Sequence, residues 1–468
     1  MTTAEATPEV TVEAVERAAS DHAFFGHPKG LGFLSFVEAC ERFSYYSMQT
    51  LLVLYMTKYL LLPEHMNGVL GLNWLRGFYG LDGQPLASKI FGAYTSLVYV
   101  TPILGGIIAD RWLGRRAALV AGGVIMSLGH FLMAIEGAFL FALITLVVGV
   151  GLFKGNIASQ VGELYSEEDD RRGMAFQIFY IFINASVIIA PLISGTLGQD
   201  VGWHYGFGTA GIVMVAGLLL YLKAGPWLPA DNRPDRSGKT ERPRMKAEDW
   251  PRLIALLALV PVLAVTLLTN QEIFNAYLVW ADQKFTLTLF GFHFLSSWMI
   301  TIDAACSFTM LVAVAAFWSF YRKRTGTEPD ELTKMIIGTV FVIGGGLCLY
   351  IGAVTAGNGK VGMFWPLMFH LINSIGFGTM MPVSLALFSK LAPKAINATV
   401  IGIYYFAFVG ANYVVGIVGG WYSTMPTPQF WLVHVASATV GLIAFILFKL
   451  FLGRMIAHEA PERADALS

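Results

Sequence analysis

Three charged residues stand close together in an otherwise apolar stretch. The segment EACERFSYYS, residues 38–47, lies within residues 31–62, which are mostly apolar. Glu38, Glu41 and Arg42 occupy positions i, i+3 and i+4, so in a helix all three point from one face. An ionisable group inside a membrane costs at least about 2.5 kcal/mol on insertion scales, so it faces a bundle interior and finds a partner there. Two carboxylates against one guanidinium predict a further cation from another helix.

The candidate cation is Lys154, in the segment VGVGLFKGNIASQ. At about 1.5 Å of rise per residue, both glutamates and Lys154 reach similar depths in their helices. Asn184 in FYIFINAS lies about as deep. We therefore expect one layer of polar groups. It is either a structural ion network that locks helices together, or a proton site in which a carboxylate exchanges a proton for a salt bridge to Arg42 or Lys154.

Tyrosines accompany this cluster. Tyr45 and Tyr46 follow Arg42 by one turn, and Tyr94 falls in the next apolar segment. Membrane tyrosines are commonly interfacial anchors, and this is the interpretation we prefer for Tyr55 and Tyr59, near the end of the segment. Tyr45 and Tyr46 lie deeper, beside the charges, where lining a cavity is an equal alternative.

The composition sets the environment of these residues. Hydrophobic residues make up 56% of the 468 residues and charged residues only 13%. This leaves too little polar surface for a soluble globule of such length, so the chain is predicted to be a polytopic membrane protein in a lipid bilayer. The formal net charge is zero, so nothing suggests a nucleic-acid partner. The three cysteines are far apart and lack metal-ligand spacing, so a disulfide framework is improbable. No cofactor and no metal is implied.

A window of about 20 apolar residues predicts twelve spanning helices. They fall near residues 31–60, 86–109, 115–136, 138–165, 173–197, 205–225, 252–282, 294–320, 333–356, 362–391, 395–421 and 430–454.

Basic residues concentrate in alternate loops, for example Arg115 with Arg116, and Arg322 with Lys323. The positive-inside pattern therefore places both termini in the cytoplasm, as expected of an inner cell membrane protein. A charged, Pro- and Gly-rich stretch between spans six and seven is a solvated linker, too short and too charged to hold an extra helical hairpin. The predicted organisation is a cytoplasmic tail (1–30), a six-helix half (31–225), a cytoplasmic linker (226–251), a second six-helix half (252–455) and a cytoplasmic tail (456–468).

At this point the motifs resemble a known family. Glu38 to Tyr46 fits the pattern ExxERFxYY, a signature of the proton-coupled oligopeptide transporters, which are a branch of the major facilitator superfamily. Similar matches are GGIIADRWLGRR from Gly105, GLFKGN from Gly151, FYIFINAS from Phe179, SKLAP from Ser389 and GAN from Gly410. The resemblance covers nearly the whole chain, strongly in the first half and loosely in the second. It implies an all-α major facilitator fold with twelve transmembrane helices in two halves.

The resemblance also implies roles for particular residues. The positions of Glu38, Glu41, Arg42 and Lys154 serve proton coupling in that family. Those of Tyr45, Tyr46 and Asn184 contact peptide, and Gln49 stands where many members carry an arginine for the peptide carboxylate. The implied activity is symport of di- or tripeptides with protons by alternating access.

Two positions of the second half depart from the family pattern. Phe377 stands where the family carries the glutamate that receives the peptide's amino terminus. A phenyl ring cannot neutralise an ammonium group, although its face can offer a cation–π contact. In span seven, Gln271 falls at the place of an acidic gate residue, with Glu272 beside it. One residue turns a helix face by about 100°, so the two are not equivalent.

Two isolated polar residues could compensate. Asp303 lies inside span eight and His370 inside span ten, and an isolated acid in a span is a candidate site. Asp303 could supply the negative charge missing at Phe377, or it could cap a backbone break or pair locally. Trp298 and Tyr404 would make this side of the pocket more aromatic.

The sequence therefore predicts a proton-coupled symporter of peptides or peptide-like compounds, acting as a monomer, with altered recognition in the second half. The alternatives are a proton-driven transporter of a non-peptide metabolite, and a receptor of the same fold that does not transport. The intact charged cluster argues against a receptor. No HExxH, G-x-S-x-G or P-loop motif occurs, so an enzyme is not expected.

Overall fold

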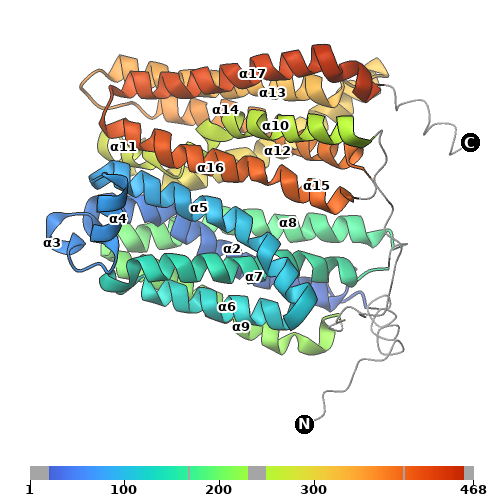
Figure 1. Ribbon diagram of the computed structural model, residues 1–468, viewed down its shortest axis with the longest axis horizontal. Helices are drawn as coiled ribbons and strands as arrows, with labels where there is room; N and C mark the ends of the chain where they lie inside the picture. Colours follow the sequence, from blue (N-terminus) through green and yellow to red (C-terminus); the bar gives the residue numbers. More distant parts are fainter. Residues whose placement is uncertain (1–20, 167–168, 230–248, 394–395, 458–468) are drawn as a thin grey trace, which may run out of the picture. The chain divides into compact units, whose positions relative to one another are not determined.

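The computed structural model describes residues 21–166, 169–229, 249–393 and 396–457, and these are almost entirely helical (Figure 1). Each predicted span corresponds to one helix or to a pair of consecutive helices. In chain order these are α2 (Lys29–Tyr55), α5 (Gly83–Ile108), α6 (Arg115–Leu132), α7 (Phe139–Glu163), α8 (Arg171–Ala190), α9 (Trp203–Lys223), α10 (Asp249–Glu272) with α11 (Ala276–Lys284), α12 (Trp298–Thr325), α13 (Glu331–Ala356), α14 (Phe364–Leu391), α15 (Asn397–Tyr404) with α16 (Phe406–Val418), and α17 (Thr427–Ala457).

Ten segments of the described chain are long and apolar enough to cross a membrane on length and composition alone. Helices α2 and α6 are not among them. Helix α2 carries the charged cluster, and α6 opens on Arg115 and Arg116. Helix α2 packs against α8 and α9, and α6 packs against α7 and α9, so polar side chains on the packed faces can find partners instead of lipid.

The chain divides into two compact units, residues 1–87 with 97–238 and residues 88–96 with 239–468. The first unit contains α2, α6, α7, α8 and α9, and the second contains α10 to α17. Helix α5 contributes to both units, because residues 88–96 pack with the second. The predicted tails and linker fall largely on residues 1–20, 230–248 and 458–468, which lie outside the described residues.

Glycines allow close approach of helices within the first unit. A Cβ added at Gly105 of α5 would clash with the backbone carbonyl of Gly151 in α7, and one added at Gly151 would lie 2.8 Å from the Cβ of Thr101. The Thr101 hydroxyl donates to the carbonyl of Val147 at 3.0 Å. Small residues at a membrane helix interface permit this packing, which positions the helix that carries Lys154.

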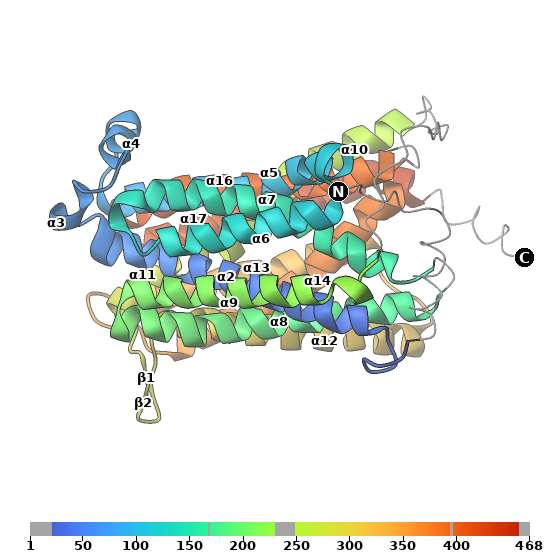
Figure 2. The same ribbon diagram turned by 90° about the horizontal axis from the view of Figure 1, so that it is seen from below.

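Short elements connect some of the spans. The chain between α2 and α5 forms α3 (Pro63–Met66) and α4 (Leu72–Tyr79). Between α11 and α12, strands β1 (Thr288–Leu289) and β2 (Phe292–His293) pair antiparallel, with Thr288 opposite His293 (Figure 2). Phe290 at the tip has a positive φ of 50° and is fully exposed. The window for spanning helices did not predict these elements.

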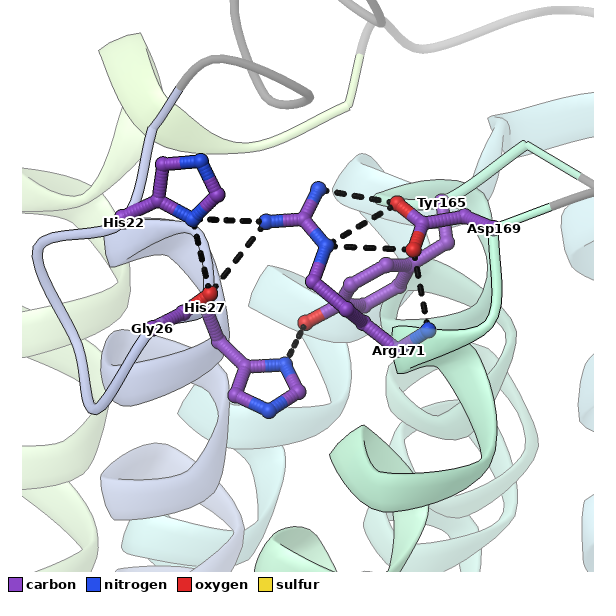
Figure 3. Close-up of polar contacts among 6 residues, drawn as sticks. All are labelled: His22, Gly26, His27, Tyr165, Asp169 and Arg171. Atoms are coloured by element: carbon purple, nitrogen blue, oxygen red, sulfur yellow. Dashed lines mark hydrogen bonds and ion pairs between the residues drawn. The ribbon is translucent and has the colours of Figure 1, made fainter.

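The segment that precedes α2 is fastened to the connection between α7 and α8 (Figure 3). The ring Nδ1 of His27 shares a hydrogen bond of 2.9 Å with the Tyr165 hydroxyl. Arg171 donates to the carbonyl oxygen of Gly26 at 3.2 Å and forms an ion pair of 2.8 Å with Asp169. Burial and the nearby Arg171 guanidinium lower the pKa of His27. The contact therefore favours a neutral imidazole.

Candidate functional site

The charged cluster of α2 is buried within the first unit. Arg42 Nε lies 3.1 Å from Glu38 Oε1 and also bonds to Glu41 Oε2. Glu38, Glu41 and Arg42 are 4%, 0% and 5% exposed. Within the described chain, Glu38 Oε2, Glu41 Oε1 and Arg42 Nη2 have no hydrogen-bond partner. Each carboxylate thus keeps one oxygen available for a proton or another partner.

Lys154 of α7 lies close enough to both glutamates to act on them electrostatically. Its ammonium group stands over the ring of Tyr99 at 4.8 Å and over that of Tyr45 at 6.0 Å. Aromatic faces attract a cation through the ring quadrupole. The predicted cation is therefore placed near the acidic pair on aromatic surfaces, without a direct ion pair to either carboxylate.

The residues that follow along α2 continue this polar face. Tyr45 is buried, and its ring meets that of Tyr46 edge to face at 5.1 Å and lies 5.2 Å from the Arg42 guanidinium. Gln49 is also buried, and its Oε1 has no partner in the part of the chain described. Tyr45 thus contacts Arg42 and Tyr46 and lies beneath the Lys154 ammonium group.

Asn184 and Tyr94 are two further candidates. Asn184 of α8 is half-buried and donates from Nδ2 to the Tyr180 carbonyl at 2.8 Å. Its Nδ2 is thus occupied within its own helix. Tyr94 of α5 is buried in the segment that packs with the second unit.

In the second unit, α10 breaks immediately after Glu272. The carboxylate accepts hydrogen bonds from Asn275 Nδ2 and from the backbone N–H of Ala276, both at 3.1 Å. Its other oxygen lies 3.5 Å from His434 Nε2 of α17. Irregular backbone is tolerated inside a membrane only where its polar groups are satisfied, and Glu272 satisfies an N–H freed by the break.

Asp303 of α12 has a partner within its own unit. Its Oδ1 lies 2.9 Å from Nδ1 of His370 in α14, and the Nε2 of this imidazole lies 2.7 Å from the hydroxyl of Tyr277 in α11. The structure therefore contains the local pairing that the sequence left open as an alternative for Asp303.

The aromatic candidates of the second unit take different positions. Trp298 begins α12 and stacks on Phe292 of the β-hairpin at 5.9 Å. Phe377 is half-buried and packs against the apolar cluster of α10, α14 and α15. The Tyr404 hydroxyl lies 3.1 Å from Ser384 Oγ, so it contacts α14 directly.

Three residues make polar contacts that we did not predict from the sequence: Tyr277, His434 and Asn412. Asn412 donates to Gln271 Oε1 at 3.3 Å. His434 carried a usable signal, because it is an isolated ionisable residue in an apolar span. Tyr277 carried none, since tyrosines are common in membrane helices.

Comparison with known proteins agrees with this arrangement. The family model described as "Major Facilitator Superfamily" matches residues 34–417. An uncharacterized transporter of Bacillus subtilis, YclF, is 30% identical over 93% of this chain and 95% of its own. The peptide transporter YePEPT of Yersinia enterocolitica is 27% identical over 85% of this chain and 88% of its own. A crystal structure of a peptide transporter POT in complex with sulfate has 26% identity and a TM-score of 0.83, covering 94% of this chain and 99% of its own.

The chain therefore belongs to the major facilitator superfamily and has its fold of two six-helix halves. Its relatives place it more narrowly in the oligopeptide transporter (POT) branch of that superfamily. It is a multi-pass membrane transporter rather than an enzyme.

Proposed function

We propose that this protein is a proton-coupled symporter of di- or tripeptides or of peptide-like compounds. The relatives described as peptide transporters, in Yersinia enterocolitica and Lactococcus lactis, support the substrate class. A variant of a peptide transporter POT, 27% identical to this chain, was solved in complex with alafosfalin. We place the protein in the inner cell membrane with both termini in the cytoplasm, in keeping with the basic loops.

The buried cluster of Glu38, Glu41 and Arg42 is the observation that carries this proposal. One guanidinium is shared by two carboxylates, and each carboxylate retains a free oxygen among the described residues. A proton arriving at one glutamate weakens both its bond to Arg42 and its attraction to Lys154 of α7, so protonation and the interaction between α2 and α7 change together. Lys154 interacts electrostatically with the same three side chains. A substrate carboxylate can compete for this lysine, because the described contacts of its ammonium group are aromatic faces and it forms no direct ion pair with Glu38 or Glu41.

We further propose that recognition in the second half differs from that of typical family members. Phe377 provides no carboxylate for a substrate ammonium group, and Asp303 is hydrogen-bonded to His370. Glu272 is committed to the helix break and to His434. Both carboxylates are therefore engaged inside the protein, which favours substrates whose amino terminus is blocked, cyclised or absent.

Uptake into liposomes holding the purified protein tests both parts. A free dipeptide such as dialanine and its N-acetylated form are compared with and without an imposed proton gradient. We expect gradient-driven accumulation and at least equal uptake of the acetylated form. Preference for the free dipeptide would refute altered recognition while supporting symport. Equal uptake with and without the gradient would refute proton coupling.

Glu41→Gln separates coupling from binding, because glutamine keeps the shape and cannot release a proton. We expect this variant to lose gradient-driven accumulation while it still exchanges external for internal substrate. Gly106→Ala on α5 is the matched control, since a Cβ there meets no atom within 4 Å. If the exchange of substrate is lost as well, Glu41 has a structural role and does not act specifically in proton coupling.

A further inference from the structure

Three titratable side chains of the second unit form a hydrogen-bonded series, and none of them belongs to the cluster on α2. It runs from Asp303 of α12 through His370 of α14 to Tyr277 of α11. The two hydrogen bonds measure 2.9 Å and 2.7 Å and use both ring nitrogens of His370. Each of the three helices therefore contributes one member.

The series is most exposed at one end. His370, Tyr277 and Asp303 are 0%, 1% and 8% exposed, so all three are buried and Asp303 keeps the largest exposed share. The Tyr277 ring is covered by Phe285, Phe369 and Trp431. A proton from outside these three side chains can thus enter at Asp303, and the His370 imidazole is the buried group to which it passes.

The charge balance favours proton uptake. When His370 is neutral, its Nδ1–H donates to Asp303 and its Nε2 accepts from the Tyr277 hydroxyl. The three side chains together then carry one negative charge. No lysine or arginine of the described residues forms an ion pair with Asp303. Two further titratable groups near Asp303 are Tyr277 and, on its own helix, Cys306, and neither can supply a positive charge. A buried net charge is costly. A proton on His370 gives an imidazolium beside the Asp303 carboxylate, so the three side chains together become neutral.

The nearby pair of Glu272 and His434 provides a contrast. His434 Nδ1 lies 2.9 Å from the Phe430 carbonyl, which has no proton to give, so Nδ1 must carry one. The contact between Nε2 and the Glu272 carboxylate then requires a second proton, on either partner. Both side chains are 0% exposed, so this proton is enclosed. The Asp303–His370 pair differs because Asp303 keeps a small exposed surface, whereas Glu272 and His434 keep none.

We propose that Asp303, His370 and Tyr277 form a proton-binding site of the second unit, which is loaded through the Asp303 carboxylate and holds the proton on the His370 imidazole. This gives the symporter a second proton site and rests on the proposed function for its role in transport. Loading changes the net charge where α11, α12 and α14 meet, so it alters the electrostatic attraction among these three helices.

Proton uptake by the purified protein in detergent tests the site without substrate. The protein is titrated from about pH 8 to about pH 5, a range that spans the ordinary histidine pKa, and bound protons are counted with an indicator dye. We expect Asp303→Asn/His370→Gln to take up about one proton fewer per chain than the unmodified protein. Asp303→Asn alone should show the same loss, because the imidazolium then lacks its carboxylate.

His293→Gln calibrates the measurement, since His293 lies on β2 and is exposed. Its removal should also cost about one proton per protein molecule. If both Asp303 variants take up as many protons as the unmodified protein, while the loss in His293→Gln is detected, the proposal is overturned. The two hydrogen bonds would then have a structural role only. Because no substrate is present, this result leaves peptide symport untouched, and failed symport in liposomes leaves the proton count untouched.

Discussion

Gln271 and Glu272 are neighbours in α10 and bind to different helices. Gln271 accepts a hydrogen bond from Asn412 of α16, whereas Glu272 lies against His434 of α17. The turn of about 100° between consecutive helical residues explains the division. An acidic residue shifted by one position is therefore directed into a different set of contacts.

Glu272→Ala should destabilise the second unit by about 2 kcal/mol, because it leaves the Ala276 N–H buried without its acceptor and leaves the Asn275 amide only the Val415 carbonyl. Glu272→Gln should retain most of the stability, since its Oε1 can accept both bonds and its amide can donate to His434 Nε2. Thermal unfolding in detergent compares the two variants. Equal destabilisation would indicate that the pair is ionised, with a glutamate facing an imidazolium.

Gly105→Ala should weaken the packing of α5 on α7 by about 1–3 kcal/mol, the usual cost of overpacking. The added Cβ meets the Gly151 backbone, which cannot move aside like a flexible side chain. Gly106→Ala on the same helix meets nothing within 4 Å and should be neutral or slightly stabilising through helix propensity. Unfolding temperatures that fall equally for both would contradict this view of the interface.

The contact between His27 and Tyr165 should be pH-dependent. The folded pKa of His27 lies below the ordinary value of 6.5, so the unfolded segment binds more protons between these two values. Stability of the contact is thus full above pH 6.5 and is lost as the pH falls toward the folded pKa. Hydrogen exchange of backbone amides before α2, after correction for the slower intrinsic exchange at lower pH, should accelerate on acidification across this window.

Tyr165→Phe provides the reference for this experiment. It removes one hydrogen bond, worth about 1 kcal/mol, so these amides should exchange about fivefold faster at neutral pH. If the exchange of the unmodified protein does not change between neutral and mildly acidic pH, His27 does not titrate in this contact.

Tyr404→Phe distinguishes a structural tyrosine from a substrate contact. The Tyr404 hydroxyl is hydrogen-bonded to Ser384 Oγ, so its loss should cost about 1 kcal/mol of stability with little change in KM for substrate. Liposome uptake over a range of substrate concentrations measures the KM. A severalfold increase in KM with unchanged stability would place Tyr404 in the substrate pocket instead.

The sequence alone allowed the bundle of spanning helices and much of the site in the first half to be predicted. Apolar runs of sufficient length must span as helices, because lipid cannot satisfy exposed backbone groups. Glu38, Glu41 and Arg42 are three and four residues apart, so helical geometry alone brings them to one face. Local spacing thus carried the information for this cluster.

The contacts of the second half depended on tertiary structure. Asp303, His370 and Tyr277 come from three helices, and the sequence separations of 67 and 93 residues contain no signal of which side chains will meet. The same holds for Glu272 and His434, 162 residues apart. The sequence determined that costly ionisable groups lie inside the membrane helices. Only the packing of those helices decided their partners, because rotation and depth are set by contacts that each helix makes with its neighbours.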